Sequence, residues 1–160
     1  MIAVLHNVRS VYNVGSIFRT ADAAGIEKIY LCGYTPAPLD RFKRSNIKLS
    51  KVALGAEEYL PWQKIFSTTK LLAKLREEGY LIFAVEQSKG SIPYFKLRKA
   101  DLSAKMVMVV GNELKGLPQA VLKQADKIIE IPMYGKKESL NVSVALGIVA
   151  FHMANLSRIK

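Results

Sequence analysis

The stretch Glu138–Met153, ESLNVSVALGIVAFHM, changes character within a few residues. It opens with Ser139, Asn141 and Ser143 close together and continues as an almost wholly apolar run. An apolar, strand-like segment over 127–131 (KIIEI) comes shortly before it. This order predicts a strand, a short polar loop and a buried helix, with a candidate binding site at the junction.

Short β-rich runs alternate with helical patterns along the rest of the chain. The runs are nearly continuously apolar, which is typical of strands in a parallel sheet that is covered on both faces. The alternation predicts an α/β fold, a mostly parallel sheet flanked by helices, in a single domain over residues 1–160. We expect strands near 2–5, 28–32, 80–85, 106–110 and 127–131, and helices near 14–24, 67–78, 118–125 and 140–157.

The charge of the chain is strongly unbalanced. Twenty-four Lys and Arg against thirteen Asp and Glu give a formal net charge of +11. A small domain this basic attracts polyanions, and nucleic acid is the leading candidate, although the charge could also serve solubility alone.

The cysteine count and the apolar segments indicate a compartment. The single Cys32 lies in an apolar run and fits a reducing cytoplasm. No basic-then-apolar signal segment opens the chain, and the longest apolar stretch, 144–151, is too short to cross a bilayer. We therefore expect a cytoplasmic protein without a membrane contact.

Several kinds of chemistry are not indicated by the motifs. The glycines never form G-x-G-x-x-G, the dinucleotide fingerprint. The segment GNELKGLP has the glycine spacing of a phosphate loop, but Leu117-Pro118 replaces the Lys-Ser/Thr pair that would hold phosphate and magnesium. Two scattered histidines and one cysteine do not form a zinc motif, so we expect no metal.

Three polar clusters each follow a predicted strand. The first contains Asn7, Arg9, Asn13 and Arg19, the second is GNELKG with Glu113, and the third is PMYGKKESLN. In open α/β sheets, ligands bind beyond the carboxyl ends of the strands, where these clusters would gather. Taken singly, each has a simpler explanation: Asn13 and Ser139 as helix caps, and Glu113 as a loop acid.

Two basic features are candidates for contact with nucleic acid. Small and apolar residues surround Arg19, which predicts a partly buried, anchored guanidinium. The segment 34–51 is predicted to be irregular and is either an RNA contact or a solvated loop. With Arg9, the residues assigned to the RNA surface are Arg41, Lys43, Arg44 and Lys48.

Three segments carry a family resemblance. NVGSIFRTADAAG, VVGNELKGLP and IPMYGKKESLNVSVALGIVAFHM resemble, in order, the three motifs of the SpoU (TrmH) branch of the SPOUT RNA methyltransferases. SKVALGAEEYLPW is similar to the segment between the motifs of that family. The resemblance covers essentially the whole chain.

The resemblance implies an enzyme that transfers a methyl group from S-adenosylmethionine to a ribose 2′-oxygen of tRNA or rRNA. It also implies a C-terminal deep trefoil knot, a homodimer with its active site at the subunit interface, and no metal. By match to the motifs, the residues that line the S-adenosylmethionine pocket would be Val85, Gly111, Ile131 and Leu140.

The resemblance also implies roles for five polar residues. Arg19 would contact RNA phosphate and stabilise the developing alkoxide, and Asn13 would place the ribose. Glu113, Ser139 and Asn141 would orient Arg19 and the bound groups by hydrogen bonds. Many relatives carry an added substrate-binding segment before the first motif, and this chain is expected to lack one.

Two other functions stay open from the sequence. The chain could be a non-catalytic, basic RNA-binding protein that retains the knotted fold, but the intact motif residues argue against this. It could also be a SPOUT enzyme that methylates a base, but the presence of both Asn13 and Arg19 favours ribose.

Overall fold

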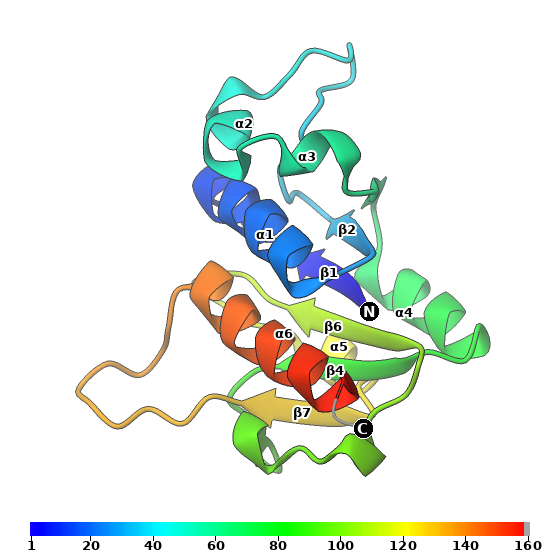
Figure 1. Cartoon of the computed structure of the whole chain (residues 1–160), viewed down its shortest axis with the longest axis vertical. Helices are drawn as coiled ribbons and strands as arrows, with labels where there is room; N and C mark the ends of the chain where they lie inside the picture. Colours follow the sequence, from blue (N-terminus) through cyan, green and yellow to red (C-terminus); the bar gives the residue numbers. More distant parts are fainter. Residues whose placement is uncertain (159–160) are drawn as a thin grey trace.

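The computed structural model describes residues 1–158, which form a parallel sheet between two layers of helices (Figure 1). The strands in these residues are β1 (Ile2–His6), β2 (Lys28–Cys32), β3 (Trp62–Ile65), β4 (Leu81–Val85), β5 (Ile92–Pro93), β6 (Met106–Val110) and β7 (Lys127–Glu130). The α-helices are α1 (Val11–Ala24), α2 (Ile47–Ala53), α3 (Ala56–Tyr59), α4 (Thr68–Glu77), α5 (Gln119–Leu122) and α6 (Val142–Arg158). Two short 3-10 turns are η1 (Tyr94–Lys96) and η2 (Lys99–Asp101).

The strand order places a topological switch in the middle of the sheet. The order is β3-β2-β1-β6-β4-β7-β5, and the strands pair in parallel throughout. After β1 the chain continues to β2 and β3 on one side, whereas after β6 it continues to β7 on the other side. The loops after β1 and β6 therefore diverge at one edge of the sheet, which is where open α/β sheets bind their ligands.

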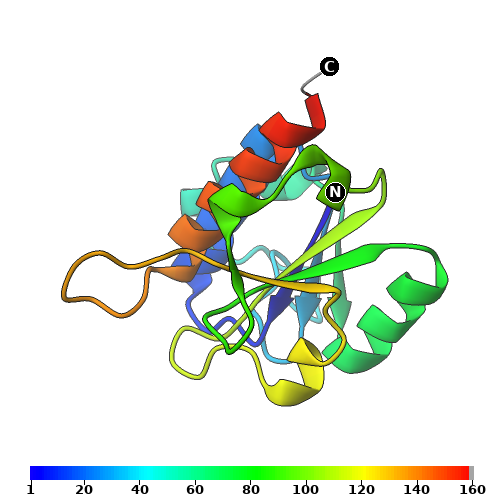
Figure 2. The same cartoon turned by 90° about the horizontal axis from the view of Figure 1, so that it is seen from below.

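Alternate strand residues supply two separate cores. On β1, Ala3 and Leu5 pack in the layer of α1 and α6, whereas Ile2 and Val4 pack in the layer of α4 and α5. Figure 2 shows these two helix layers on opposite sides of the sheet. Burial on both faces explains why the strands are nearly continuously apolar in sequence.

Helices α1 and α6 lie side by side on one face (Figure 1). They approach closely at Gly147, where an added Cβ would lie 3.2 Å from Cγ2 of Thr20. The start of α6 lies near the start of α1, where the Asn141 side-chain amide donates to Asn13 at 3.0 Å, although more than a hundred residues separate the two in sequence.

The five predicted strands are confirmed to within a residue at each end. The four predicted helices also form, but α1 begins at Val11, three residues before the predicted start, and the helix predicted over 118–125 is limited to α5 (Gln119–Leu122). Ser10 is its N-cap, and the Ser10 hydroxyl accepts a hydrogen bond from the Asn13 N–H at 3.3 Å. The interpretation of Asn13 as a helix cap is therefore wrong, and its side chain is free for other contacts.

The sequence analysis missed the edge strands β3 and β5 and the helices α2 and α3. The segment 34–51 was predicted to be irregular throughout, but α2 begins within it at Ile47 and is capped by Asn46. The Asn46 side chain accepts from the Leu49 N–H at 3.3 Å. The apolar face of α2 packs on α1, where a Cβ at Gly15 would lie 2.7 Å from the Leu49 carbonyl oxygen.

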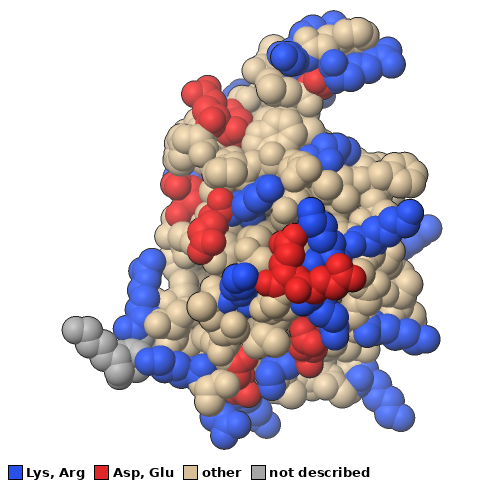
Figure 3. Space-filling model, turned by 90° about the vertical axis from the view of Figure 1, so that its right-hand side faces the viewer, with Lys and Arg blue, Asp and Glu red and all other residues tan. Residues whose placement is uncertain are grey.

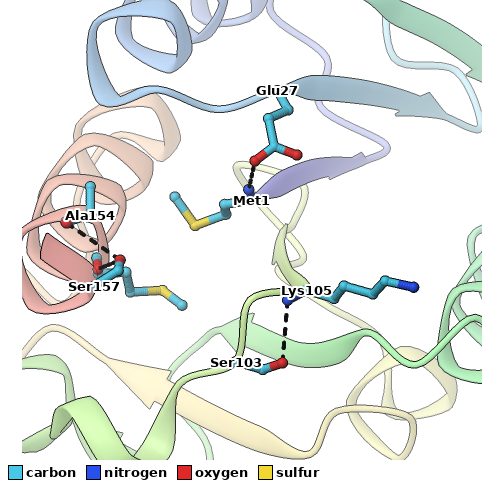
Figure 4. A network of polar contacts seen from close by, with 7 residues as sticks. Met1, Glu27, Ser103, Lys105, Ala154 and Ser157 are labelled. Atoms are coloured by element: carbon cyan, nitrogen blue, oxygen red, sulfur yellow. Dashed lines mark hydrogen bonds and ion pairs between the residues drawn. The ribbon is translucent and has the colours of Figure 1, made fainter.

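The amino edge of the sheet has its own small network (Figure 4). The Met1 ammonium group pairs with Glu27 at 2.7 Å, and the Ser157 hydroxyl donates to the Met153 carbonyl at 2.6 Å. A cavity of about 220 Å³ lies here, lined in part by Met106, at the edge opposite to the carboxyl ends of the strands.

None of the helices in residues 1–158 combines the length and apolarity that crossing a bilayer requires.

Candidate functional site at the carboxyl edge of the sheet

The carboxylate of Glu113 joins the loop after β6 to the turn between β1 and α1. Its Oε2 accepts the Arg9 N–H at 2.9 Å, and its Oε1 accepts the Ser10 N–H at 2.9 Å and the Asn13 side-chain amide at 3.0 Å. These bonds cross the topological switch of the sheet. Two of the three predicted strand-end clusters are therefore in direct contact.

The surroundings of Glu113 favour its ionised form. Burial acts to raise the pKa of Glu113, but hydrogen bonds from the N–H groups of Arg9 and Ser10 and from Asn13 outweigh it, so that its pKa is lowered below the ordinary value. The group is therefore an acceptor-only carboxylate at neutral pH.

A second set of hydrogen bonds extends from Asn13 to the start of α6. Asn13 Oδ1 accepts from the Asn141 side-chain amide at 3.0 Å. Asn141 Oδ1 in turn accepts the N–H and the hydroxyl of Ser143, at 2.8 and 2.7 Å, and the Asn141 carbonyl accepts the Ala145 N–H at 2.9 Å. Asn141 thus caps α6, and the interpretation of Ser139 as that cap is wrong.

The third strand-end cluster forms one wall of a cavity of about 330 Å³. The loops after β4, β6 and β7 and the start of α6 enclose this space. The four predicted cofactor residues Val85, Gly111, Ile131 and Leu140 all line it, together with Ser139. The structure therefore brings together the residues that sequence comparison assigned to one pocket.

The loop after β6 can form only with glycine at two positions. A Cβ at Gly111 would lie 2.6 Å from the carbonyl carbon of Gly116, which is closer than van der Waals contact permits. Gly116 has φ +62, and a Cβ there would lie 2.3 Å from Oε2 of Glu86. That Glu86 oxygen accepts the Leu117 N–H at 2.7 Å, so the loop is held against the end of β4.

The cavity is acidic although the chain is strongly basic. Glu86, Glu113, Glu130 and Glu138 line it, whereas Lys115 is the one basic residue among the described residues that do so. Apolar side chains cover other parts of the wall. Such a lining suits a ligand with an apolar body and a positive charge.

The loop between β7 and α6 stands out from the body of the molecule (Figures 1 and 2). Residues 134–141 are all exposed. The loop is tied back at one point, where the Gln87 side-chain amide donates to the Glu138 carbonyl at 2.8 Å. Ser139 and Leu140 lie just after this tie, on the cavity wall.

Arg19 does not join this cluster within a single chain. It is exposed, and no hydrogen bond or ion pair of its side chain occurs in residues 1–158, so the expectation of a partly buried, anchored guanidinium is wrong. Within residues 1–158, Glu113, Ser139 and Asn141 form no hydrogen bond to its side chain, and their role in orienting Arg19 stays a prediction for a site shared by two copies. The reason is the early helix start: six residues separate Asn13 from Arg19 within α1, which places their side chains about 120° apart around the helix axis.

The residues assigned to the RNA surface are all exposed: Arg9, Arg41, Lys43, Arg44 and Lys48. Figure 3 shows Lys and Arg side chains on the projection that the segment before α2 forms, at the top of the view. At its tip, the ring of Phe42 lies 4.7 Å from the Arg41 guanidinium carbon and 5.1 Å from that of Arg44. The sequence analysis did not single out this exposed aromatic side chain.

Asp40 organises the tip of this projection. It accepts from the N–H groups of Phe42 and Arg44 at 2.7 and 3.0 Å and pairs with the Arg44 guanidinium at 2.7 Å. The hydrogen bond from the Arg44 N–H is the main cause of the lowered pKa of Asp40. Arg44 is therefore partly neutralised, which leaves Arg41 and Lys43 as the freer charges.

The sequence analysis also missed Glu86, Tyr34 and Asn112 as residues that shape the site. Asn112 was visible only as a member of GNELKG, and Tyr34 as the first residue of a basic segment. A polar residue next to a glycine at the end of a buried strand was the available signal for Asn112.

Within residues 1–158, no group of three or more His, Cys, Asp or Glu side chains is arranged to hold a metal ion.

Comparison with known proteins identifies relatives along almost the whole chain. The model of the SpoU rRNA Methylase family matches residues 1–151. The tRNA (guanosine(18)-2′-O)-methyltransferase of Aquifex aeolicus is 34% identical over 151 residues, which are 94% of this chain and 67% of that protein. The 23S rRNA (guanosine-2′-O-)-methyltransferase RlmB of Neisseria meningitidis is 32% identical over 149 residues, 93% of this chain and 56% of that protein.

Solved structures agree with the fold. A TrmH/SpoU tRNA modifying enzyme from A. aeolicus superposes with a TM-score of 0.82 at 30% identity, over 97% of this chain and 74% of that one. An rRNA methyltransferase from Sinorhizobium meliloti with bound AdoMet superposes with a TM-score of 0.86 at 30% identity, over 99% and 57% of the two chains. The chain thus spans between half and three quarters of the length of these relatives. The knot stays a prediction from the family resemblance.

The contacts of Glu113 predict a pH-dependent stability. Glu113→Gln keeps one acceptor oxygen but turns an NH₂ group toward N–H donors, so we expect the free energy of unfolding at pH 7 to fall by about 1–2 kcal/mol. Because the folded pKa of Glu113 is lowered, its stabilisation is present above the ordinary carboxyl value of about 4.3 and is lost as pH falls through the folded pKa.

Urea unfolding of both proteins between pH 7 and pH 3 measures this effect. The difference between wild type and Glu113→Gln should shrink at the acid end of the range. Glu58→Gln, which changes an exposed acid on α3, should show no such difference at any pH. A difference for Glu113→Gln that is constant with pH would show that the ionised carboxylate is not its source.

Proposed function

Because this chain belongs to the SpoU rRNA methylase family, we propose that it transfers a methyl group from S-adenosylmethionine to a ribose 2′-oxygen in RNA. The observation that carries the proposal is the acidic cavity at the carboxyl edge of the sheet, which is lined by Glu113, the residue that binds Asn13 and through it Asn141. The relatives are methyltransferases of tRNA and of 23S rRNA, so we propose that the substrate belongs to one of these two classes.

The cavity fits S-adenosylmethionine in size and in charge. Its volume of about 330 Å³ lies at the lower end of the range for small-molecule sites. Val85, Ile131 and Leu140 would hold the apolar parts of the cofactor, and the carboxylates on the wall would favour its positive sulfonium and amino groups. A non-catalytic RNA-binding protein would need basic surface but no acidic pocket, which makes that alternative weaker.

When bound, S-adenosylmethionine would supply a methyl carbon that bonds to the ribose 2′-oxygen while the carbon–sulfur bond breaks, its electron pair going to sulfur and the hydroxyl proton going to water. Asn13 and Asn141, which Glu113 connects to the cavity wall by hydrogen bonds, would position the ribose. Glu113 would hold both in place, since its carboxylate binds Asn13 directly.

We propose that the active site is completed by a second copy of the chain. Val144 and Phe151 lie seven residues apart on one stripe of α6 and are 49% and 44% exposed, which is unusual for such an apolar helix. Arg19 is exposed on the adjacent helix α1 without a partner among the described residues. In a homodimer packed through α1 and α6, Arg19 of one copy would reach the site of the other.

The projection before α2 is the proposed RNA-binding surface. Arg41 and Lys43 would contact phosphates, and Phe42, which has two guanidinium groups near its ring, would offer a stacking surface. An RNA substrate and the buried, unpaired Cys32 agree with a cytoplasmic location, which we also propose.

The first test is a calorimetric titration of the protein with S-adenosylmethionine and with S-adenosylhomocysteine. We expect saturable binding of both at one site per chain, together with transfer of labelled methyl groups to unmodified tRNA or 23S rRNA transcripts. If neither ligand binds, the cavity is not a cofactor site, and a basic RNA-binding protein becomes the better description.

Arg19→Ala should lower kcat about 10²- to 10³-fold, because a positive charge at the developing alkoxide is lost, while cofactor affinity stays within about twofold. Mixing Arg19→Ala with Asn13→Ala tests whether the two residues act from different copies. Random exchange makes half of the dimers mixed, each with one intact site of two, so roughly a quarter of the wild-type activity should return. No recovery on mixing would place Arg19 and Asn13 in the same site of one chain.

The double variant Arg41→Ala/Lys43→Ala should weaken binding to unfractionated tRNA and reduce its salt dependence. Loss of two phosphate contacts reduces the magnitude of the negative slope of log K against log salt by roughly 1.4 to 1.8. The matched control is Lys74→Ala/Lys123→Ala, which removes the same charge from exposed positions in the layer of α4 and α5. Equal slopes for the two double variants would exclude the projection from the RNA interface.

A further inference from the structure

A second hollow lies next to the proposed cofactor cavity. It has a volume of about 450 Å³ and is lined by Arg9, Tyr34, Asn112, Leu114 and Lys115. We infer that it holds the base of the nucleotide whose ribose is methylated, with Tyr34 as the stacking surface. This inference rests on the proposed function and assigns a subsite to it.

Tyr34 is held rigidly and is nevertheless exposed. Its N–H donates to Oδ1 of Asn7 at 3.2 Å, and its hydroxyl oxygen accepts from Nδ2 of Asn112 at 2.9 Å. The residue remains 57% exposed. A tyrosine that is held at its backbone and at its hydroxyl loses little conformational freedom when a base stacks on its ring, which favours binding.

The turn that presents Tyr34 requires unusual backbone geometry. Asn7 has φ +54, in the left-handed region, and Gly33 has φ +61. A Cβ at Gly33 would lie 1.9 Å from Oδ1 of Asn7, which is the oxygen that holds Tyr34. The ends of β1 and β2 are thus shaped together around this ring.

Asn112 connects the hollow to the cofactor cavity. Its Nδ2 donates to the Asn7 carbonyl at 2.8 Å and to Tyr34, and its Oδ1 accepts the N–H groups of Leu114 and Lys115 at 3.0 and 2.9 Å. The Asn112 side chain is only 7% exposed, and both its donor hydrogens and its acceptor oxygen are hydrogen-bonded.

The two cavities share a wall that is one loop thick. Asn112, Leu114 and Lys115 line both of them. A base in the hollow would therefore have its own ribose at the edge of the cofactor cavity, beside the loop that carries Glu113. This is the arrangement that a reaction at the 2′-oxygen needs.

The rim of the hollow has the composition of a single-stranded nucleotide site. Arg9 and Lys115 are exposed, and neither side chain forms an ion pair within residues 1–158, so both charges are available for phosphates. Leu114 is 78% exposed and adds apolar surface near the Tyr34 ring. An aromatic ring with cations beside it binds unstacked bases with little dependence on sequence.

Three variants separate a stacking role from a structural one. Tyr34→Phe keeps the ring, Tyr34→Ala removes it, and Tyr59→Ala removes an exposed tyrosine on α3 whose hydroxyl is also hydrogen-bonded, to Asp22 at 3.1 Å. The measurements are kcat/KM for methyl transfer to unmodified tRNA and 23S rRNA transcripts and, by calorimetry, affinity for S-adenosylhomocysteine.

If Tyr34 stacks on the target base, Tyr34→Ala lowers kcat/KM roughly 5- to 150-fold, the range that base–aromatic stacking supports. Tyr34→Phe and Tyr59→Ala stay within about threefold of wild type, and all three variants keep their affinity for S-adenosylhomocysteine. A matching loss of S-adenosylhomocysteine affinity in Tyr34→Ala would show that the ring only supports the loop after β6. An unchanged kcat/KM in Tyr34→Ala would also overturn the assignment.

A second measurement tests the subsite even if the wild-type protein methylates neither RNA, which would refute the proposed function. Saturation-transfer NMR with the four ribonucleoside 5′-monophosphates should show transfer to base protons in the wild type and in Tyr34→Phe, but not in Tyr34→Ala. Absence of transfer in the wild type, or equal transfer in Tyr34→Ala, would remove the base from this hollow.

Discussion

The carboxylate of Glu113 supplies negative charge to a helix start that lacks its own. No acidic residue occurs in the first turn of α1, yet the N–H groups of Arg9 and Ser10 point outward just before it. Such a helix start carries partial positive charge and unpaired donors. Glu113 satisfies two of these donors from a position about a hundred residues later in the chain, and so it ties the loop after β6 to the turn after β1.

The remaining elements of the site depend on this contact. Once Glu113 holds Asn13, the other side of the Asn13 amide binds Asn141, and Asn141 caps α6. The first turn of α6 also has no acidic residue, so a neutral amide does the work of a cap there. Three loops that start from different strands are thereby joined through side chains, since the sheet ladder itself fixes only the strands.

The buried part of the fold could be predicted from the sequence because burial on both faces leaves a continuous apolar run in each central strand. The edge strands could not: β3 consists of half-buried and exposed residues, and β5 has two residues, so neither shows a strand pattern. The pocket residues around Gly111 and Leu140 were predicted from motifs. The environment of Arg19 could not be predicted in this way. Its sequence neighbours are small and apolar because they lie on the buried face of α1, whereas the Arg19 side chain lies on the exposed face.

The distribution of charge explains how one small chain could receive two ligands of opposite sign. The outer surface carries most of the excess of Lys and Arg, whereas four glutamates line the cavity. A polyanion is attracted to the surface but repelled from the cavity, and exposed charges that lie more than a Debye length of about 8 Å apart are largely screened from each other. Lys115 lies on the wall that the cavity shares with the neighbouring hollow, and so it marks the boundary between the two fields. A nucleotide at that boundary would present its sugar to the acidic side while its phosphates stay on the basic side.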